Sequence, residues 1–278
     1  MEAADSEVVE IRRPGVWVRC SANAEEWVRP LLDEGPTLYA AAGRRRREEP
    51  LGPELAGRGA VFLVEGPNDT KWAVRHYLRG GWMAPVLGDR FLPPLTPLGA
   101  YRPFQEARAS DRLRRRGVAT PKVVAAAVYP GPVWYRGDLV TEYVEGYQEL
   151  VRYLFHVRPG RMGGPVDEAL YRVGRLVRKL ARVGAYHRDL NAKNILIPDE
   201  MDSGPLHVLD LDRCSVRERN GEWSQAGRKM LRRLERSLRK WAETAGPPLP
   251  PDAWVALREG YADPVPITDG GAAPPDTP

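Results

Sequence analysis

The sequence predicts an α+β fold in two parts, with strands dominating residues 55–142 and helices dominating residues 143–262. Three observations support this prediction. Apolar runs of strand length flank Gly/Pro/Asn/Asp turns in the first part. Apolar residues recur at helical spacing in the second part. A polar loop there follows a long helical pattern and leads into an apolar strand. The 278 residues suffice for one two-lobed domain or two small domains.

The composition excludes several classes of protein. The two cysteines, Cys20 and Cys214, lie far apart, which argues against a disulfide framework or a zinc site and suits a reducing cytoplasm. No apolar run approaches the ~18 residues of a membrane span, and residues 1–10 do not have the apolar core of a signal peptide. The net charge of +5 favours anionic partners such as nucleotide, phospholipid or nucleic acid, without choosing among them.

Residues 1–54 are predicted to form an N-terminal extension that packs on the strand-rich part, in a role that the sequence leaves open. Within it, residues 16–19 have the composition of a strand, and residues 23–32 have the apolar spacing of a short helix. Residues 43–50 hold four consecutive arginines followed by two glutamates, which favours a solvated loop over a nucleic-acid-binding arm.

A β-hairpin is predicted over residues 60–77, around a turn at 66–69. Gly57 and Gly59 precede it, and glycines there allow a backbone to approach a phosphate without a Cβ in the way. The second strand carries Arg75 where phosphoryl-transfer enzymes place a cation that binds nucleotide phosphates. Arginine keeps that charge and can bind phosphate bidentately. The alternative is an exposed strand arginine.

Glu106 is the candidate to hold the Arg75 cation in place, because it lies in the first turns of a helix predicted over residues 103–116. The alternative is a plain surface glutamate. The four arginines at the end of this helix favour a solvated helix end over a binding patch.

A segment that connects the two parts follows the strands predicted over residues 122–129 and 133–143. The second strand runs into an acidic, glycine-bearing stretch, where the composition changes. There the backbone of Glu142 and its neighbours is predicted to face an adenine.

Asp189 and Asn194 lie five positions apart in the loop 187–194, which reads His-Arg-Asp-Leu-Asn-Ala-Lys-Asn before an apolar strand. This spacing is typical of phosphoryl-transfer enzymes. The Asp must lie beside the attacking hydroxyl, as proton acceptor or orienting group, and the Asn must reach a magnesium ion on the nucleotide phosphates. The alternative is a surface loop that has this sequence by chance.

Asp210 follows a short strand predicted over residues 206–209, which pairs with the strand after Asn194. A carboxylate in this position is the second magnesium ligand of such sites. The usual Asp-Phe-Gly is Asp-Leu-Asp here, so the glycine is missing. Asp212 either adds charge or orients Arg213. The alternative is a strand that ends in solvated acids.

An amphipathic helix is predicted over residues 225–243, after a similar helix over 166–184. A core-packed helix with a solvated basic side is favoured. The alternative is a basic side that meets an anionic membrane surface, where each close Lys or Arg contributes about 1 kcal/mol. Residues 263–278, rich in Pro, Gly and Asp, are predicted to be disordered. In the helix predicted over residues 225–243, the apolar face carries Met230, Leu231, Leu234, Leu238 and Trp241.

The order of these motifs resembles the 3-deoxy-D-manno-octulosonic acid (Kdo) kinases of the lipopolysaccharide kinase group, which are relatives of the core heptose kinases. The resemblance covers roughly residues 55–243, and the family's arginine at the usual lysine position accounts for Arg75. Arg188 departs from it by restoring His-Arg-Asp. The motifs are Gly-Arg-Gly at 57–59, Val-Arg-His-Tyr-x-Arg-Gly-Gly at 74–81, Phe-x-Glu at 104–106, Asp-Leu-Asn-Ala-x-Asn-Ile-Leu at 189–196, Leu-Asp-x-Asp-Arg at 209–213 and Arg-Ser-Leu-x-Lys at 236–240.

This resemblance implies a protein-kinase-like bilobal fold, with a mixed β-sheet N-lobe and a mostly helical C-lobe. It implies transfer of the γ-phosphate of ATP, with Mg²⁺, to O-4 of Kdo on a lipid A precursor in lipopolysaccharide core biosynthesis. The enzyme would be cytoplasmic and peripheral on the cytoplasmic face of a Gram-negative inner membrane. The implied roles are Asp189 as base or orienting carboxylate, Asn194 and Asp210 as magnesium ligands, Arg75 as phosphate clamp and Glu106 as its partner.

Three other functions stay open at this point. A kinase of the same fold could act on heptose, another sugar or a protein hydroxyl, although the missing Ala-Pro-Glu motif argues against a protein substrate. An inactive kinase-like binding module would suit the arginine and the lost glycine, whereas the intact Asp189, Asn194 and Asp210 argue against it. A nucleic-acid binder lacks support from any aromatic-basic motif, so no nucleic-acid partner is expected.

Overall fold

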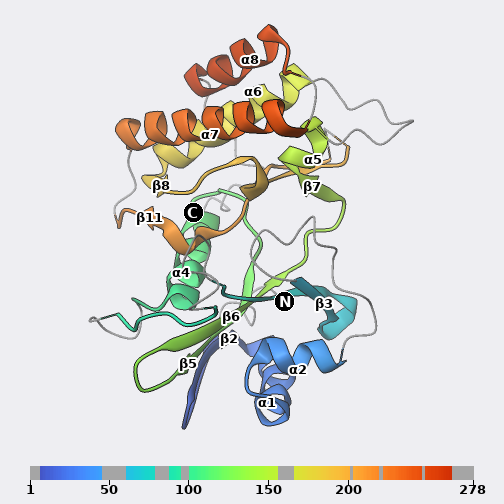
Figure 1. Ribbon diagram of the computed structural model, residues 1–278, viewed down its shortest axis with the longest axis vertical. Coiled ribbons are helices and arrows are strands. Elements are labelled where there is room, and N and C mark those ends of the chain that lie inside the picture. Colours follow the sequence, from blue (N-terminus) through green and yellow to red (C-terminus); the bar gives the residue numbers. More distant parts are fainter. Residues whose placement is uncertain are drawn as a thin grey trace, which may run out of the picture. The chain divides into compact units, whose positions relative to one another are not determined.

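The computed structural model describes residues 7–45, 61–78, 88–94, 100–155, 166–200, 203–218, 222–245 and 248–264 (Figure 1). The chain divides into two units. The first comprises Met1–Ser110 and Pro121–Val144, and the second comprises Asp111–Thr120 and Glu145–Pro278. The chain therefore first enters the second unit within the helix α4 (Arg102–Arg115).

The first unit is built on a six-stranded sheet with the strand order β1-β2-β5-β6-β4-β3. Its pairings are all antiparallel, so this sheet is not the mixed one that the resemblance implies. The sequence predicts β2 but not β1, which reads VVEIRR and buries only Ile11 at the sheet edge. The strands are β1 (Val8–Arg13), β2 (Val16–Ser21), β3 (Val61–Glu65), β4 (Lys71–His76), β5 (Val123–Pro130) and β6 (Tyr135–Glu142).

Helices cover both faces of this sheet. Ala125 and Ala127 of β5 belong to the core formed with α1 and α2, whereas Ala126 belongs to the core formed with Phe104 of α4. Successive side chains of a strand point to opposite faces, so β4 likewise directs Arg75 toward α4 and His76 toward α2. The helices on the face opposite α4 include α1 (Glu25–Glu34) and α2 (Leu38–Arg45), so residues 43–45 are helical where the sequence predicts a loop.

In its described part, the second unit combines two small sheets with the helices α5 to α8. One sheet has the order β10-β9-β7, and the other pairs β11 with β8. Among the described residues, no helix combines the length and the apolarity needed to cross a membrane. The strands are β7 (Tyr147–Glu149), β8 (Ala185–His187), β9 (Ile195–Pro198), β10 (His207–Val208) and β11 (Cys214–Val216), and the helices are α5 (Leu150–Phe155), α6 (Val166–Arg182), α7 (Ser224–Ala245) and α8 (Pro251–Ala262).

Helix α6 delivers the chain to β8 and packs closely against α8, beside α7 (Figure 1). Two glycines permit this approach. A Cβ at Gly174 would clash with the Leu257 carbonyl oxygen, and a Cβ at Gly260 would clash with the Tyr171 carbonyl oxygen. Asp263, where the predicted disordered tail begins, accepts a hydrogen bond from the Tyr171 hydroxyl (2.8 Å), and residues 265–278 lie outside the described part.

Candidate active site

His187 ends β8 and connects the loop 187–194 to the stretch before Asp210. Its side chain is fully buried. The Asp189 N–H donates to His187 Nδ1 (3.1 Å), so Nε2 carries the proton and donates to the Leu209 carbonyl oxygen (2.9 Å). One neutral imidazole therefore fixes the backbone of both stretches. The sequence predicts this histidine only as part of the loop motif and gives it no role.

Asp189 and Asn194 are joined directly. Asn194 Nδ2 donates to the main-chain oxygen of Asp189 (2.9 Å), and Asn191 Nδ2 donates to the same oxygen (3.0 Å). Asn191 Oδ1 caps the 3₁₀ turn Ala192–Asn194 by accepting from the Lys193 N–H (2.9 Å). The five-residue spacing thus closes a short loop around one carbonyl group. An amide that donates through Nδ2 presents its oxygen on its other side.

Asp210 is brought to the same place by strand pairing. Val208 of β10 pairs with Ile195 of β9, and the Leu209 N–H donates to the Asn194 carbonyl oxygen (2.9 Å). Asp210 itself has φ +59°, in the left-handed region that costs a non-glycine residue about 1–2 kcal/mol. Such strain clusters at functional sites. Asp212, in the following 3₁₀ turn, is buried, whereas Arg188 is exposed.

The donor set of Asn194 and Asp210 suits a magnesium ion. Both side chains offer oxygen ligands, which hard divalent cations prefer. No three His, Cys, Asp or Glu side chains gather as a metal cage in the described part of the chain. Mg²⁺ is usually held by one or two carboxylates together with substrate phosphates and water.

Helix α7 packs on the loop and contributes a cation to it. The Ala192 N–H donates to Ser237 Oγ (3.2 Å), and the His187 N–H contacts Met230 Sδ (3.3 Å). Between these contacts, Arg233 Nη2 donates to Asp189 Oδ1 (2.5 Å). The sequence predicts the basic helix but does not pair Arg233 with Asp189. The available signal is spacing, since residues 233 and 237 are four apart and share one face of the helix.

Arg116 supports the ribbon of β8 and β11 that carries His187. Its guanidinium donates to the carbonyl oxygens of Val183 (2.7 Å), Arg217 (2.8 Å) and Glu218 (2.8 Å), which flank the two paired strands. The sequence predicts residues 112–116 to be a solvated helix end. In the structure, Arg116 instead bonds to the main chain next to both strands and so connects β8 and β11 at one end of the ribbon.

In the first unit, Arg75 forms an ion pair with Glu106. Arg75 Nη2 donates to both carboxylate oxygens of Glu106, at 2.7 Å each, and the Tyr77 hydroxyl also donates to that carboxylate. The Arg75 guanidinium lies 5.1 Å from the centroid of the Tyr77 ring. The Glu106 side chain is 6% exposed and that of Arg75 is 27% exposed, so an anionic group can still reach the cation.

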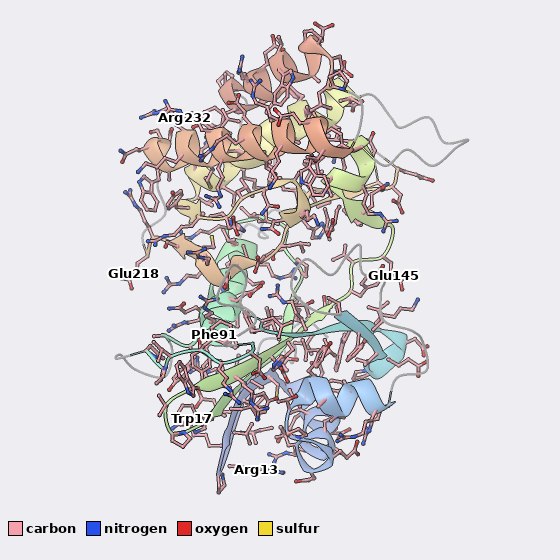
Figure 2. The ribbon with its side chains drawn as sticks, in the orientation of Figure 1. Arg13, Trp17, Phe91, Glu145, Glu218 and Arg232 are labelled. Carbon is pink, nitrogen blue, oxygen red and sulfur yellow. The ribbon has the colours of Figure 1, made fainter. Side chains whose placement is uncertain are left out.

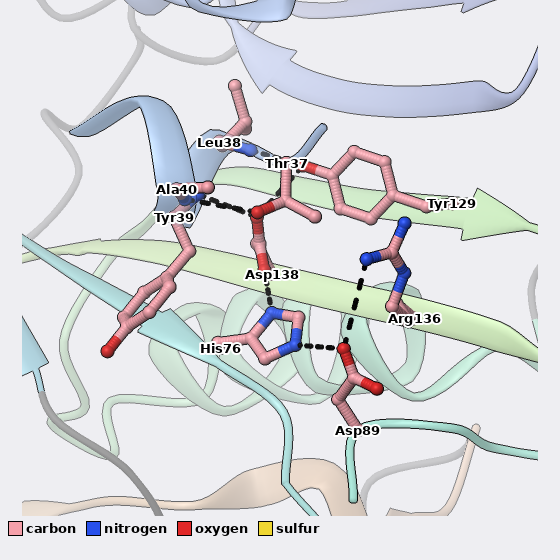
Figure 3. A network of polar contacts seen from close by, with 9 residues as sticks. All are labelled: Thr37, Leu38, Tyr39, Ala40, His76, Asp89, Tyr129, Arg136 and Asp138. Carbon is pink, nitrogen blue, oxygen red and sulfur yellow. Dashed lines mark hydrogen bonds and ion pairs between the residues drawn. The ribbon is translucent and has the colours of Figure 1, made fainter. Parts of the chain in front are cut away.

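His76, the residue after Arg75, joins two carboxylates on the opposite face of β4 (Figure 3). Its Nδ1 lies 2.5 Å from Asp138 Oδ1 and its Nε2 lies 3.1 Å from Asp89 Oδ2. Burial alone would lower the pKa of His76, but the hydrogen bonds and charges of Asp138 and then Asp89 outweigh it and raise the pKa above its ordinary value. An imidazolium with both N–H groups donating fits this arrangement.

Asp138 carries this network to the start of α2 (Figure 3). The Asp138 side chain is fully buried, and its Oδ2 accepts from the Tyr39 N–H (2.8 Å) and from the Tyr129 hydroxyl (2.9 Å). The Tyr129 hydroxyl in turn accepts from the Leu38 N–H (2.6 Å). These bonds satisfy N–H groups that a helix start leaves without intrahelical partners. The strand that carries Arg75 is thereby tied to α2.

The remaining candidates for nucleotide binding are the backbone at Glu142, which the structure describes, and two glycines, which it does not. The Glu142 N–H donates to the Lys122 carbonyl oxygen (2.9 Å) and the Tyr143 N–H donates to the Lys71 carbonyl oxygen (2.8 Å). These two N–H groups are used within the first unit, so an adenine would have to meet other backbone groups of this segment. Gly57 and Gly59 lie outside the described residues.

Glu149 is a buried carboxyl beside the loop that the sequence did not indicate. It ends β7 and pairs with Leu196 of β9. Burial raises the pKa of Glu149 to about 7, against the opposing charges of Lys193 and then Arg152. Within the described residues, its Oε2 has no hydrogen-bond partner. A substantial fraction of this carboxyl is therefore protonated near neutral pH.

Comparison with known proteins assigns the chain to a family. The family model described as "Lipopolysaccharide kinase (Kdo/WaaP) family" matches residues 44–261. The chain belongs to the lipopolysaccharide kinase (Kdo/WaaP) family. It is 32% identical over 238 residues to the 3-deoxy-D-manno-octulosonic acid kinase of Actinobacillus succinogenes, covering 84% of this chain and 93% of the relative. It is 34% identical over 211 residues to that of Vibrio cholerae, covering 76% and 83%.

A solved structure supports the fold. The chain resembles the structure titled "WaaP in complex with acyl carrier protein" with a TM-score of 0.51, 22% identity and coverage of 86% of both chains. The predicted protein-kinase-like α+β fold and the predicted family are confirmed. As a lipopolysaccharide kinase, the protein is a phosphotransferase, and its family implies ATP as the phosphoryl donor.

Proposed function

We propose that this protein transfers the γ-phosphoryl group of ATP to a sugar hydroxyl, O-4 of Kdo on a lipid A precursor, in lipopolysaccharide core biosynthesis. The observation that carries this proposal is the hydrogen-bonded arrangement of Asp189, Asn194 and the Leu209–Asp210 backbone. The acceptor is supported by relatives named 3-deoxy-D-manno-octulosonic acid kinase, of which 83% to 96% of the length aligns with this chain.

Asp189 is the proposed catalytic residue. Its carboxylate orients the acceptor hydroxyl and takes its proton as the oxygen attacks the γ-phosphorus. The bond between the γ-phosphorus and the β–γ bridging oxygen breaks, and ADP leaves with that bond's electron pair. Asn194 and Asp210 would hold Mg²⁺, which when bound neutralises negative charge on the phosphates. His187 keeps these groups in register through its two backbone contacts.

Arg75 is the proposed phosphate clamp, and Glu106 is its partner. The ion pair with Glu106 fixes the guanidinium, and partial exposure lets it bind an anionic phosphate bidentately. We also assign Gly57, Gly59 and the backbone near Glu142 to nucleotide binding, as the sequence predicts. For the Glu142 segment, that role falls to groups other than the N–H groups of Glu142 and Tyr143.

We place the enzyme on the cytoplasmic face of the inner membrane, as a peripheral protein. Lys229, Arg236 and Lys240 are exposed and share the side of α7 that carries Arg233, because they follow one another at spacings of three or four residues. Each contributes about 1 kcal/mol when close to an anionic lipid surface. The side of α7 nearest Asp189 would then face the membrane that holds the acceptor. Residues 1–54 are the proposed N-terminal extension of the N-lobe.

Incubation with labelled ATP and a panel of Kdo-lipid, heptose-containing and protein acceptors tests the proposal. We expect label on the Kdo acceptor alone and a loss of about 10²–10⁴-fold in kcat for Asp189→Ala, because that variant removes the group that takes the proton. Asp167→Ala, on the exposed first turn of α6, is the matched control and should keep wild-type turnover. Label on another acceptor class, or full turnover by folded Asp189→Ala, would contradict the proposal.

A further inference from the structure

Arg233 lies directly on the proposed catalytic carboxylate. Its Nη2 is 2.5 Å from Asp189 Oδ1. Phosphoryl transfer requires Asp189 to meet the acceptor hydroxyl, yet one of its two oxygens is covered by this guanidinium. An acceptor that draws Arg233 away from Asp189 therefore gains access to Oδ1.

Helix α7 limits where this cation can go. The contacts of Ser237 with Ala192 and of Met230 with His187 hold the helix against the loop within a turn on either side of Arg233. The Arg233 side chain is nevertheless 44% exposed, whereas that of Asp189 is 14% exposed. The backbone at Arg233 is therefore fixed, while its long side chain can exchange between Asp189 and an anion that arrives from the solvent side.

The acceptor itself can supply that anion. The planar guanidinium fork matches a carboxylate bidentately, and Kdo is a sugar acid whose carboxylate belongs to the same small molecule as the reacting hydroxyl. We propose that Arg233 is a specificity-determining residue that binds the carboxylate of an acidic sugar acceptor and thereby releases Asp189 Oδ1 to the hydroxyl. This inference rests on the proposed function and names the group by which the acceptor is recognised.

A neutral sugar cannot make this exchange, because it offers no charge to compete with Asp189 for Arg233. A phosphate on the lipid part has the same sign of charge, but it is not part of the sugar that carries the reacting hydroxyl. The carboxylate is therefore the expected partner, and the two anions can be removed separately in an experiment.

The test uses the full chain with three detergent-dispersed acceptors: a Kdo-lipid A precursor, its analogue with the Kdo carboxylate converted to an amide, and its dephosphorylated analogue. Wild type is compared with Arg233→Ala, Arg233→Lys and the matched control Arg232→Ala, which removes the same charge at the preceding position of α7 (Figure 2). KM and kcat are measured for each acceptor and for ATP, and thermal unfolding verifies that each variant is folded.

We expect the wild type to have a KM for the amide about 10–100-fold above that for the carboxylate, since a hydrogen bond between charged groups is lost. Dephosphorylation should leave the KM within about twofold. Arg233→Ala should raise the KM for the carboxylate acceptor to that of the amide and leave the KM for ATP unchanged. Arg233→Lys should recover part of the preference, and Arg232→Ala should behave as wild type.

Two results would overturn this inference alone. One is a folded Arg233→Ala that keeps the wild-type preference for the carboxylate, or that lowers kcat equally on both acceptors with the KM ratio unchanged. The other is a preference of the wild type that follows the lipid phosphate and not the carboxylate. A wild-type protein that phosphorylates no Kdo acceptor would overturn the proposed function and this inference with it.

Discussion

The two units hold their functional side chains by different means. In the second unit, main-chain groups fix the loop: the Asp189 carbonyl oxygen accepts from two asparagine amides, and the Leu209 N–H donates to Asn194. In the first unit, ionisable side chains fix Arg75 and its strand, through Glu106 on one face of β4 and the His76–Asp138 pair on the other. The loop is thus held by local geometry, whereas Arg75, the proposed phosphate clamp, is held by charge between distant parts of the chain.

This difference has a physical consequence. Bonds between neutral main-chain and amide groups do not change with pH, so the spacing of Asp189 and Asn194 should persist wherever the chain is folded. The ion pair of Arg75 and the imidazolium of His76 depend on protonation and on burial. The first unit should therefore be the more sensitive of the two to charge-removing substitutions, and the following experiments test this.

The largest expected effect follows Arg75→Met. This substitution takes the cation from Glu106, whose side chain is 6% exposed, and breaking a buried pair in this way costs about 3–5 kcal/mol. Asn194→Ala, which removes one amide hydrogen bond from the loop, should cost about 1 kcal/mol. Urea denaturation compares the free energies of unfolding. If the two variants are equally destabilised, charge does not distinguish the units.

Glu149→Gln probes a buried ionisable group beside the loop of the second unit. Burial raises the pKa of Glu149 to about 7, so the folded state favours the protonated carboxyl. Its contribution is lost as pH rises from the unfolded pKa of 4.5 through about 7. The variant should therefore be more stable than wild type at pH 8, by about 3 kcal/mol at most, with little gain at pH 4. Gln148→Ala serves as the exposed-side control on the same strand, and a gain independent of pH would contradict the buried-acid explanation.

The smallest expected effect compares two histidines. The raised pKa of His76 means that its contribution to stability is fully present below pH 6.5 and is lost as pH rises through the folded value. Burial lowers the pKa of His207, so its neutral form is favoured and stability falls as pH drops below 6.5. Unfolding free energies of His76→Gln and His207→Gln, measured against wild type from pH 5 to 9, should diverge with opposite slopes. If the two free-energy differences changed with pH in the same direction, the opposite pKa shifts of His76 and His207 would be contradicted.

The loop of the second unit was predictable because its chemistry is local. Asp189 and Asn194 are five positions apart, and Asp210 follows a strand paired to the one that begins after Asn194. Spacing along the chain was therefore enough to place Asp189 and Asn194 in one loop, where the Asn194 side chain contacts Asp189, and to predict that the strand before Asp210 pairs with the strand after Asn194. Arg233 and Arg116 were not predictable in the same way, because an arginine in a basic run gives no sign of which carboxylate or carbonyl oxygen it will reach.

The helix α2 likewise depends on contacts with distant residues that the sequence does not predict. Its short sequence ends in arginines and resembles a solvated loop, and its first N–H groups are satisfied by Tyr129 and Asp138, about 100 positions further along the chain. A short helix is marginal in isolation and depends on such tertiary partners. Strand β1 was missed for a related reason. Its extended conformation is stabilised by antiparallel pairing with β2, which the pattern of its own residues does not indicate.

The close crossing of α6 and α8 has a consequence for biosynthesis. The helix that leads into the loop 187–194 is covered by residues 251–262, which are made after the other helices and strands described above. A nascent chain that has already made Asp189, Asn194 and Asp210 still exposes the apolar stripe of α6. We therefore expect the packing of α6 to be completed only after residues 251–262 are made, when Gly174 and Gly260 can meet.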